Sequence, residues 1–163
     1  MSVHERVTAL YEAERDHIYG YLLYFGVPAG RAQELAQDAF LKLYLRMSKG
    51  EEIENPRAWL YKVAHNSALR FHQREPNFDG LAAAAEPADR VPDPERAVME
   101  RQRRAVLLAA IRELSPQQRN CLHLRVEGLR YREIADVIGI STSAVAEFLR
   151  RAAVRLKGVL DGY

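Results

Sequence analysis

The sequence predicts an all-α protein of two small helical domains joined by a flexible acidic linker. Apolar residues recur every three or four positions through both halves of the chain, and no β-like alternation persists. The stretch from Glu75 to Pro94 holds four prolines and few bulky apolar residues, so it cannot form a core of its own. A length of 163 residues fits two small domains. We therefore expect domains over residues 1–75 and 95–163, with the linker over 76–94.

Composition places the chain among globular proteins and excludes several classes. Hydrophobic residues make up 48% and charged residues 28% of the sequence, and no apolar run approaches the roughly 20 residues that cross a bilayer. The first residues carry no basic segment followed by an apolar stretch, so we expect no signal peptide. A single cysteine, Cys121, excludes an internal disulfide. We expect a cytoplasmic protein without membrane insertion.

Charge is unevenly distributed along the chain. Residues 1–74 carry 10 Lys/Arg against 9 Asp/Glu, residues 75–99 carry 2 against 6, and residues 100–163 carry 12 against 7. The net charges of these segments are thus +1, −4 and +5. A basic C-terminal end behind an acidic middle indicates contact with a polyanion, a weak signal because basic faces are common in helical proteins.

Three helices are predicted in the N-terminal domain. The first covers residues 3–25 and ends before Gly26. The second starts at Ala29, and the third opens at Asn55-Pro56, a capping residue followed by proline at the first helical position. The apolar stripe of the second helix consists of Ala32, Leu35, Ala36, Ala39, Phe40, Leu43 and Met47. The stripe of the third consists of Leu60, Val63, Ala64, Ser67 and Phe71.

The C-terminal domain is predicted to begin with two helices and to end with a helix-turn-helix. Asp93-Pro94 opens a helix over 95–114, and the capping box SPQQ at 115–118 opens the next, which ends at Gly128. Cys121 lies on an apolar stripe with Leu122, Leu124 and Val126, which predicts a buried and inert thiol.

The segment REIADVIGISTSAVAEFLRR, residues 132–151, carries the helix-turn-helix prediction. A helix over 131–138 stops at Gly139, which supplies the left-handed backbone of the turn, and Ala135 is the small residue where two helices cross. A last helix then runs to about residue 160. Its start offers hydroxyls and backbone amides to phosphates and base edges from Ser141, Thr142 and Ser143. The alternative is an ordinary helical hairpin.

One face of the predicted third helix suits single-stranded nucleic acid. Residues 57–74 contain four Lys/Arg and no acid. Outside the core stripe, one face of this helix consists of Trp59, Lys62, Asn66 and Arg70. Aromatic rings stack on bases, Lys and Arg follow the backbone, and an amide reads a base edge. The alternative is that Trp59 belongs to the core and the charges form a solvated face.

A second face of the helix that starts at Ala29 predicts a surface for a protein partner. Its members are spaced at i, i+3, i+4 and i+7, and they are Asp38, Leu41, Lys42 and Leu45. Two leucines outside the core stripe, bracketed by charges, are typical of a helix that docks on a partner. The alternative is a helix buried on two sides within its bundle.

These segments, in this order, resemble the extracytoplasmic-function (ECF) sigma factors, the smallest members of the primary sigma family. QELAQDAFLKLYLR at 33–46 resembles the region 2 helix that binds core RNA polymerase. NPRAWLYKVAHNSALRF at 55–71 is similar to the segment that opens and reads the −10 element, and residues 114–156 are similar to region 4, which reads the −35 element. The resemblance implies a transcription initiation factor that directs polymerase to promoters and has no enzymatic activity.

The resemblance also implies partners and contact residues. The partners are core RNA polymerase, through the clamp of its β′ subunit and its β flap, promoter DNA, and an anti-sigma factor. The expected polymerase contacts are Asp38, Leu41, Lys42 and Leu45. The expected −10 contacts are Trp59, Lys62, Asn66, Arg70 and Arg74. The expected −35 contacts are Ser141, Thr142, Ser143, Glu147, Arg150 and Arg151.

The predicted recognition helix departs from the family pattern. Val145 is followed by Ala146, Glu147 and Phe148, and arginines come only at positions 150 and 151. Glu147 either accepts a hydrogen bond from a cytosine amino group or repels phosphates. Two other hypotheses therefore stay open: a sigma-like mimic that binds a regulator of sigma factors instead of DNA, and a helix-turn-helix repressor or activator. The histidines show no metal-ligand spacing and no catalytic motif stands out, so we expect no metal, cofactor or enzyme activity.

Overall fold

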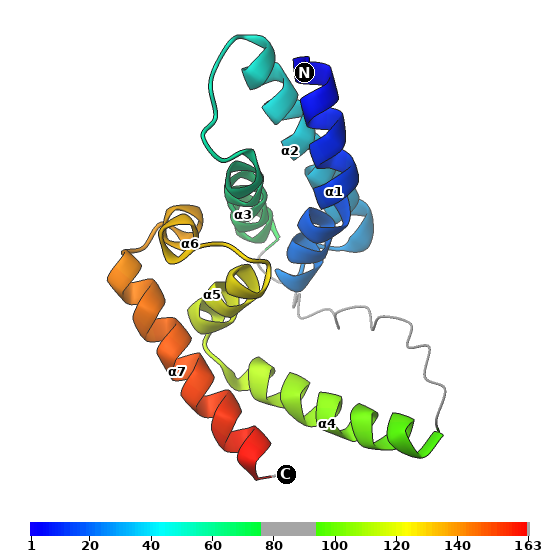
Figure 1. Cartoon of the computed structure of the whole chain (residues 1–163), viewed down its shortest axis with the longest axis vertical. Helices are drawn as coiled ribbons and strands as arrows, with labels where there is room; N and C mark the ends of the chain where they lie inside the picture. Colours follow the sequence, from blue (N-terminus) through cyan, green and yellow to red (C-terminus); the bar gives the residue numbers. More distant parts are fainter. Residues whose placement is uncertain (76–93, 163) are drawn as a thin grey trace. The chain divides into compact units, whose positions relative to one another are not determined.

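The computed structural model describes residues 1–75 and 94–162, which form seven α-helices and no strand. Contacts between the helices divide the chain into two compact units, Met1–Ala85 and Glu86–Tyr163 (Figure 1). The all-α, two-domain prediction is confirmed. The predicted linker over 76–94 lies outside the described residues except for Pro94, the first residue of a helix. None of the described helices is long and apolar enough to span a membrane.

The first unit is a bundle of three helices, each of which contacts the other two. These are α1 (Val3–Tyr24), α2 (Ala29–Ser48) and α3 (Pro56–Arg74). Ser2 and Glu5 form a capping box at the start of α1, and the Asn55 side chain accepts a hydrogen bond of 3.1 Å from the Ala58 amide at the start of α3. These caps satisfy backbone amides that have no partner within their own helix.

Helix α2 buries the stripe that its sequence predicts. All seven predicted positions are buried, from Ala32 to Met47, and a fully buried Leu such as Leu43 contributes about 1.5–3 kcal/mol relative to an exposed one. Two tyrosines, Tyr21 of α1 and Tyr61 of α3, fill the space beside it with their ring centroids 5.5 Å apart. The Tyr21 hydroxyl lies 2.8 Å from Nδ1 of the buried His65, so this polar pair is satisfied inside the core.

The predicted stripe of α3 is wrong at two positions. Val63 and Phe71 are only half-buried, whereas Tyr61, His65 and Ala68 are buried in addition to the predicted residues. The reason is that α3 packs on both α1 and α2. Its buried arc is therefore wider than a stripe of three- and four-residue steps covers.

The second unit consists of α4 (Pro94–Glu113), α5 (Pro116–Val126), α6 (Tyr131–Ile138) and α7 (Thr142–Asp161). Helix α7 contacts the other three. Its core contains fully buried Leu124, Leu129 and Ile134, and an ion pair of 2.8 Å from Arg155 to Glu113 joins α7 to α4 at the surface.

Helices α6 and α7 meet in the predicted helix-turn-helix. Gly139 has φ 82° and ψ 36°, and its amide donates to the Ala135 carbonyl at 2.9 Å. This left-handed conformation strains any residue with a Cβ. The Ser141 hydroxyl accepts a 3.1 Å hydrogen bond from the Ala144 amide and caps α7, so the sequence interpretation of this turn is confirmed.

Helix α5 buries its cysteine but not its last residue. Cys121 is fully buried, and burial raises the pKa of its thiol to about 11. The thiol therefore stays protonated and unreactive at neutral pH. Val126, predicted on the same apolar stripe, is 77% exposed. That position was predicted wrongly because α5 ends there and Gly128 turns the chain away.

Candidate nucleic-acid interface

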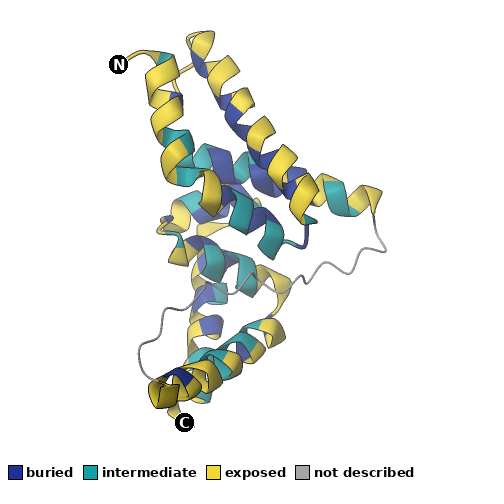
Figure 2. Cartoon of the chain, turned by 90° about the vertical axis from the view of Figure 1, so that its right-hand side faces the viewer, coloured by how far each residue is buried: buried dark blue, intermediate teal, exposed yellow. Residues whose placement is uncertain are grey.

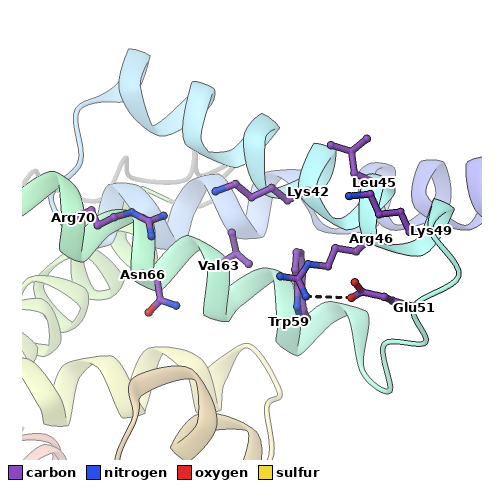
Figure 3. Close-up of a pocket in the computed structure, with 9 residues that line it drawn as sticks. All are labelled: Lys42, Leu45, Arg46, Lys49, Glu51, Trp59, Val63, Asn66 and Arg70. Carbon is purple, nitrogen blue, oxygen red and sulfur yellow. Dashed lines mark hydrogen bonds and ion pairs between the residues drawn. The ribbon is translucent and has the colours of Figure 1, made fainter.

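A groove of about 410 Å³ lies between α2 and α3 in the first unit (Figure 3). Nine residues line it: Lys42, Leu45, Arg46, Lys49, Glu51, Trp59, Val63, Asn66 and Arg70. Three of them were predicted to contact nucleic acid, and two were predicted to contact a protein partner. The groove therefore joins two surfaces that the sequence places on separate helices.

The chemistry of the groove is basic, aromatic and amide-bearing. The lining contains four Lys/Arg and one carboxylate, Glu51, which accepts a hydrogen bond of 3.1 Å from Arg46. Trp59 is half-buried against the wall, and Asn66 and Arg70 are exposed. Along α3, the labelled side chains run from Trp59 through Val63 and Asn66 to Arg70 (Figure 3). This arrangement provides a stacking ring, a hydrogen-bonding amide and cations along one path.

Three polar lining residues, Arg46, Lys49 and Glu51, were missed from the sequence. Arg46 and Lys49 continue the spacing of Lys42 and Leu45 at i, i+3, i+4 and i+7, so helical periodicity carried their signal. Conversely, the half-buried Lys62 and the exposed Arg74 are not among the described residues that line the groove. The contacts of Lys62 and Arg74 with the −10 element therefore stay predictions that the groove lining does not address.

Several basic residues of 55–74 have structural partners instead. Arg57 donates from Nε to Glu14 at 2.8 Å and lies over the Tyr61 ring at 5.4 Å, which ties α3 to α1. The His72 ring contacts the carbonyl of Phe25. Burial lowers the pKa of His65, so its imidazole is neutral at neutral pH.

The outer face of α2 is open to solvent. Leu41 is 56% and Leu45 48% exposed, and Asp38 and Lys42 are exposed beside them. Buried and exposed positions alternate along the helices of this unit (Figure 2). The alternative interpretation, a helix buried on two sides, is therefore wrong.

The first turns of α7 present a polar face opposite a buried one. Val145 and Leu149 point into the core, whereas Thr142, Ser143 and Ala146 are exposed. Because Ser141 is the cap, the amides of Thr142 and Ser143 have no carbonyl partner within the helix. One turn further along, the exposed face continues with charged residues.

Glu147, Arg150 and Arg151 form one ion-paired cluster on that face. Arg150 donates from Nε to Glu147 Oε2 at 3.1 Å and from Nη2 to Oε1 at 2.8 Å, and Arg151 donates from Nε to Oε1 at 2.8 Å. These hydrogen bonds lower the pKa of Glu147 to about 2, first through Arg150 and then through Arg151. The carboxylate is thus ionised at neutral pH, with its charge neutralised by its neighbours.

The two units have the fold of two solved structures, one of which is a sigma factor. The chain superposes on the sigma factor RpoE of Bartonella quintana, solved in complex with the anti-sigma factor NepR, with a TM-score of 0.64 at 21% identity, covering 94% of this chain and 96% of that one. It superposes on CnrH, solved with the cytosolic domain of CnrY, with a TM-score of 0.60 at 21% identity, covering 98% and 90%.

Sequence comparisons identify the family. Residues 10–76 match the family model for Sigma-70 region 2, and residues 104–156 match that for Sigma-70, region 4. The chain is 30% identical over 161 residues to the ECF RNA polymerase sigma factor BldN of Streptomyces coelicolor, covering 93% of this chain but only 59% of the longer BldN. It is 31% identical over 146 residues to the RNA polymerase sigma-H factor of Pseudomonas aeruginosa, covering 83% of this chain and 76% of that factor. The matching models name the family as sigma-70, which corrects the expected label of primary sigma family. The chain belongs to the ECF sigma factors, which are non-enzymatic proteins that direct transcription initiation at promoters.

Proposed function

We propose that this sigma factor holds a single-stranded −10 element in the groove between α2 and α3, reads a −35 duplex with α7, and docks on core RNA polymerase through the outer face of α2. The observation that carries this proposal is the groove itself. It gathers four cations, a tryptophan and an amide from two helices. Cations that follow a phosphate backbone, a ring that stacks on bases and an amide that binds a base edge are the groups that a single-stranded nucleic acid requires.

A single strand fits the groove better than a duplex does. The side chain of Trp59 is half-buried, and burial restricts the movement of its indole ring. A ring held in this way can stack on any unpaired base in the groove. Base–aromatic stacking is worth about 1–3 kcal/mol per base. Lys42, Arg46 and Lys49 lie along one side of the groove on α2, where they neutralise the phosphates of the bound strand.

The polymerase contact is proposed for the part of α2 that turns away from the groove. Leu41 is more than half exposed and does not belong to the described groove lining, and Asp38 precedes it by one turn. Exposed leucines beside charges are the type of residue that anchors a helix on a partner. Lys42 and Leu45 lie at the border, within reach of both the polymerase surface and the DNA strand.

An anti-sigma factor is the proposed regulator of this chain. The support is that two proteins of the same fold, RpoE and CnrH, were solved with protein partners, in the first case a named anti-sigma factor. Because the outer face of α2 combines Leu41 and Leu45 with flanking charges, we propose it as a surface for which polymerase and the anti-sigma factor compete.

Reconstituted transcription tests the proposal. The full chain is assembled with core polymerase on a promoter that the wild-type holoenzyme selects from genomic fragments. Trp59→Ala with Asn66→Ala is expected to reduce open-complex formation about 10-fold or more, because a stacking and a hydrogen-bonding contact are lost. Arg31→Ala is the control, since it removes an exposed cation of the same unit that pairs with Glu34 outside the groove lining, and it is expected to have a small effect.

Two outcomes would contradict the proposal in different ways. Normal open-complex formation by the Trp59/Asn66 variant would overturn the groove as the −10 site. A wild-type chain that binds core polymerase but supports no promoter-dependent transcription would favour the sigma-like mimic.

A further inference from the structure

The arginines of the recognition face are not independent cations. Arg150 uses one edge of its guanidinium, Nε and Nη2, to grip both oxygens of Glu147. Arg151 reaches the same carboxylate with Nε. All three side chains are partly or fully exposed on the side of α7 opposite Val145 and Leu149. The cluster therefore lies where a recognition helix meets base edges.

Three of the N–H donors of the Arg150 guanidinium are not directed to Glu147. A guanidinium has five N–H groups in a fixed plane, and two of them on Arg150 are directed to Glu147. Its other edge, formed by Nη1 and the second hydrogen of Nη2, is a pair of parallel donors. That pair matches O6 and N7 of guanine, the commonest specific contact of arginine in the major groove.

We propose that Glu147 is a positioning residue that holds Arg150 so that its outer edge reads a guanine in the −35 duplex. The proposal rests on the proposed function, in which α7 enters the major groove. It is an alternative to the hypothesis that Glu147 reads a cytosine directly, and it is favoured because both carboxylate oxygens already accept hydrogen bonds from arginine. Because Glu147 already holds one edge of the Arg150 guanidinium, this side chain loses less rotamer freedom when its other edge binds a base.

The same cluster limits non-specific binding. Two guanidiniums and one carboxylate carry a net charge of +1 where two free arginines would carry +2. Sequence-independent affinity depends on the number of phosphates that the protein neutralises. Glu147 therefore lowers affinity for any duplex while it raises discrimination for the correct one.

A selection experiment separates these effects. The full chain, assembled with core polymerase, selects from a duplex library randomised upstream of a fixed −10 element. The variants are Arg150→Lys, Glu147→Ala and Glu147→Gln, and Arg155→Lys is the control on the same helix, because Arg155 pairs with Glu113 instead.

Wild type and Arg155→Lys are expected to enrich a guanine at one position. Arg150→Lys is expected to lose that preference by roughly 10-fold to 100-fold, since lysine lacks the paired donors. Glu147→Ala is expected to reduce the guanine preference at the same position and to raise the affinity for unselected duplex at low salt. Glu147→Gln also raises non-specific affinity but keeps part of the preference, because its amide oxygen accepts one hydrogen bond without carrying charge.

Replacing the enriched guanine by 7-deazaguanine tests the contact directly. Loss of binding by wild type, with no further loss in Arg150→Lys, is expected. An unchanged guanine preference in Glu147→Ala, or tolerance of 7-deazaguanine by wild type, would overturn the role of Glu147 and leave the −35 assignment intact. Failure of the wild type to enrich any upstream sequence would overturn the −35 assignment itself.

Discussion

The two proposed DNA-binding regions differ in how their polar groups are assembled. In the first unit, the groove takes residues from α2, from α3 and from the segment between them, and within its described lining an ion pair joins Arg46 to Glu51. In the second unit, Glu147, Arg150 and Arg151 all belong to α7, at spacings of three and four. A concave site for an unpaired base requires walls from separate elements, whereas a helix that fits a major groove carries its contacts and their supports on one face.

The comparison also distinguishes a unit with two proposed contact surfaces from a unit with one. The first unit presents the groove and the outer face of α2, and the second presents the recognition face of α7. Single substitutions in the two units are therefore expected to separate polymerase binding from DNA binding.

The largest expected effect is the loss of polymerase binding in Leu41→Asp. Leu41 is 56% exposed, so a charge there leaves the bundle folded, but it removes an apolar anchor worth at least about 2 kcal/mol, or roughly 30-fold in affinity. Binding to core polymerase is measured beside the helical signal in circular dichroism. Arg150→Ala in the second unit is expected to bind polymerase normally. Unfolding of Leu41→Asp, as expected instead for the fully buried Leu43→Asp, would contradict the assignment.

A second prediction concerns the turn of the second unit. Gly139→Ala places a Cβ on a backbone with φ 82°, with no atom within 4 Å to clash, so the cost is backbone strain of about 1–2 kcal/mol. Gly158→Ala, also in open space but within α7, is expected to stabilise by about 0.5–1 kcal/mol. Labelling of the single cysteine, Cys121, reports opening of this unit, and fluorescence of the single tryptophan, Trp59, reports the first. A shift of the Trp59 transition in Gly139→Ala would contradict the independence of the two units.

The smallest effect is a pH dependence expected in the first unit. Burial lowers the pKa of His65 from 6.5, so the unfolded chain binds a proton more readily than the folded one. The stabilisation is fully present above pH 6.5 and is lost as pH falls from 6.5 towards the lower folded pKa. Glu147 in the second unit keeps its charge down to a pH of about 2. Trp59 fluorescence during urea unfolding at several pH values is expected to show this decline in the wild type and less of it in His65→Gln. Equal declines in both chains would contradict the assignment.

Sequence patterns predicted single helices well and their combinations less well. The stripe of α2 and the turn at Gly139 depend on local spacing, and both agree with the structure. The stripe of α3 was misjudged at Val63 and Phe71 because burial from two neighbours widens the buried arc. Arg46 and Lys49 were missed although they continue the helical spacing of Lys42 and Leu45, because the sequence does not show that this face of α2 borders a groove with α3.

The ion pairing of Glu147 with Arg150 and Arg151 was accessible from the sequence but was not recognised. Carboxylates and arginines at i+3 and i+4 pair on a helix surface, and Glu147 precedes Arg150 and Arg151 by these steps. Which oxygen receives which donor depends on side-chain rotamers, and only the structure shows that both oxygens are occupied.

Binding of holoenzyme to two promoter probes tests most directly that the groove takes a single strand and α7 takes a duplex. One probe has its −10 region single-stranded and lacks an upstream element, and the other is fully duplex and ends before the −10 region. We expect Trp59→Ala to weaken binding about 10-fold on the first probe only, and Arg150→Ala to weaken binding about 10-fold on the second only. Equal losses on both probes for either variant, or the reverse pattern, would contradict the division of DNA recognition between the two units.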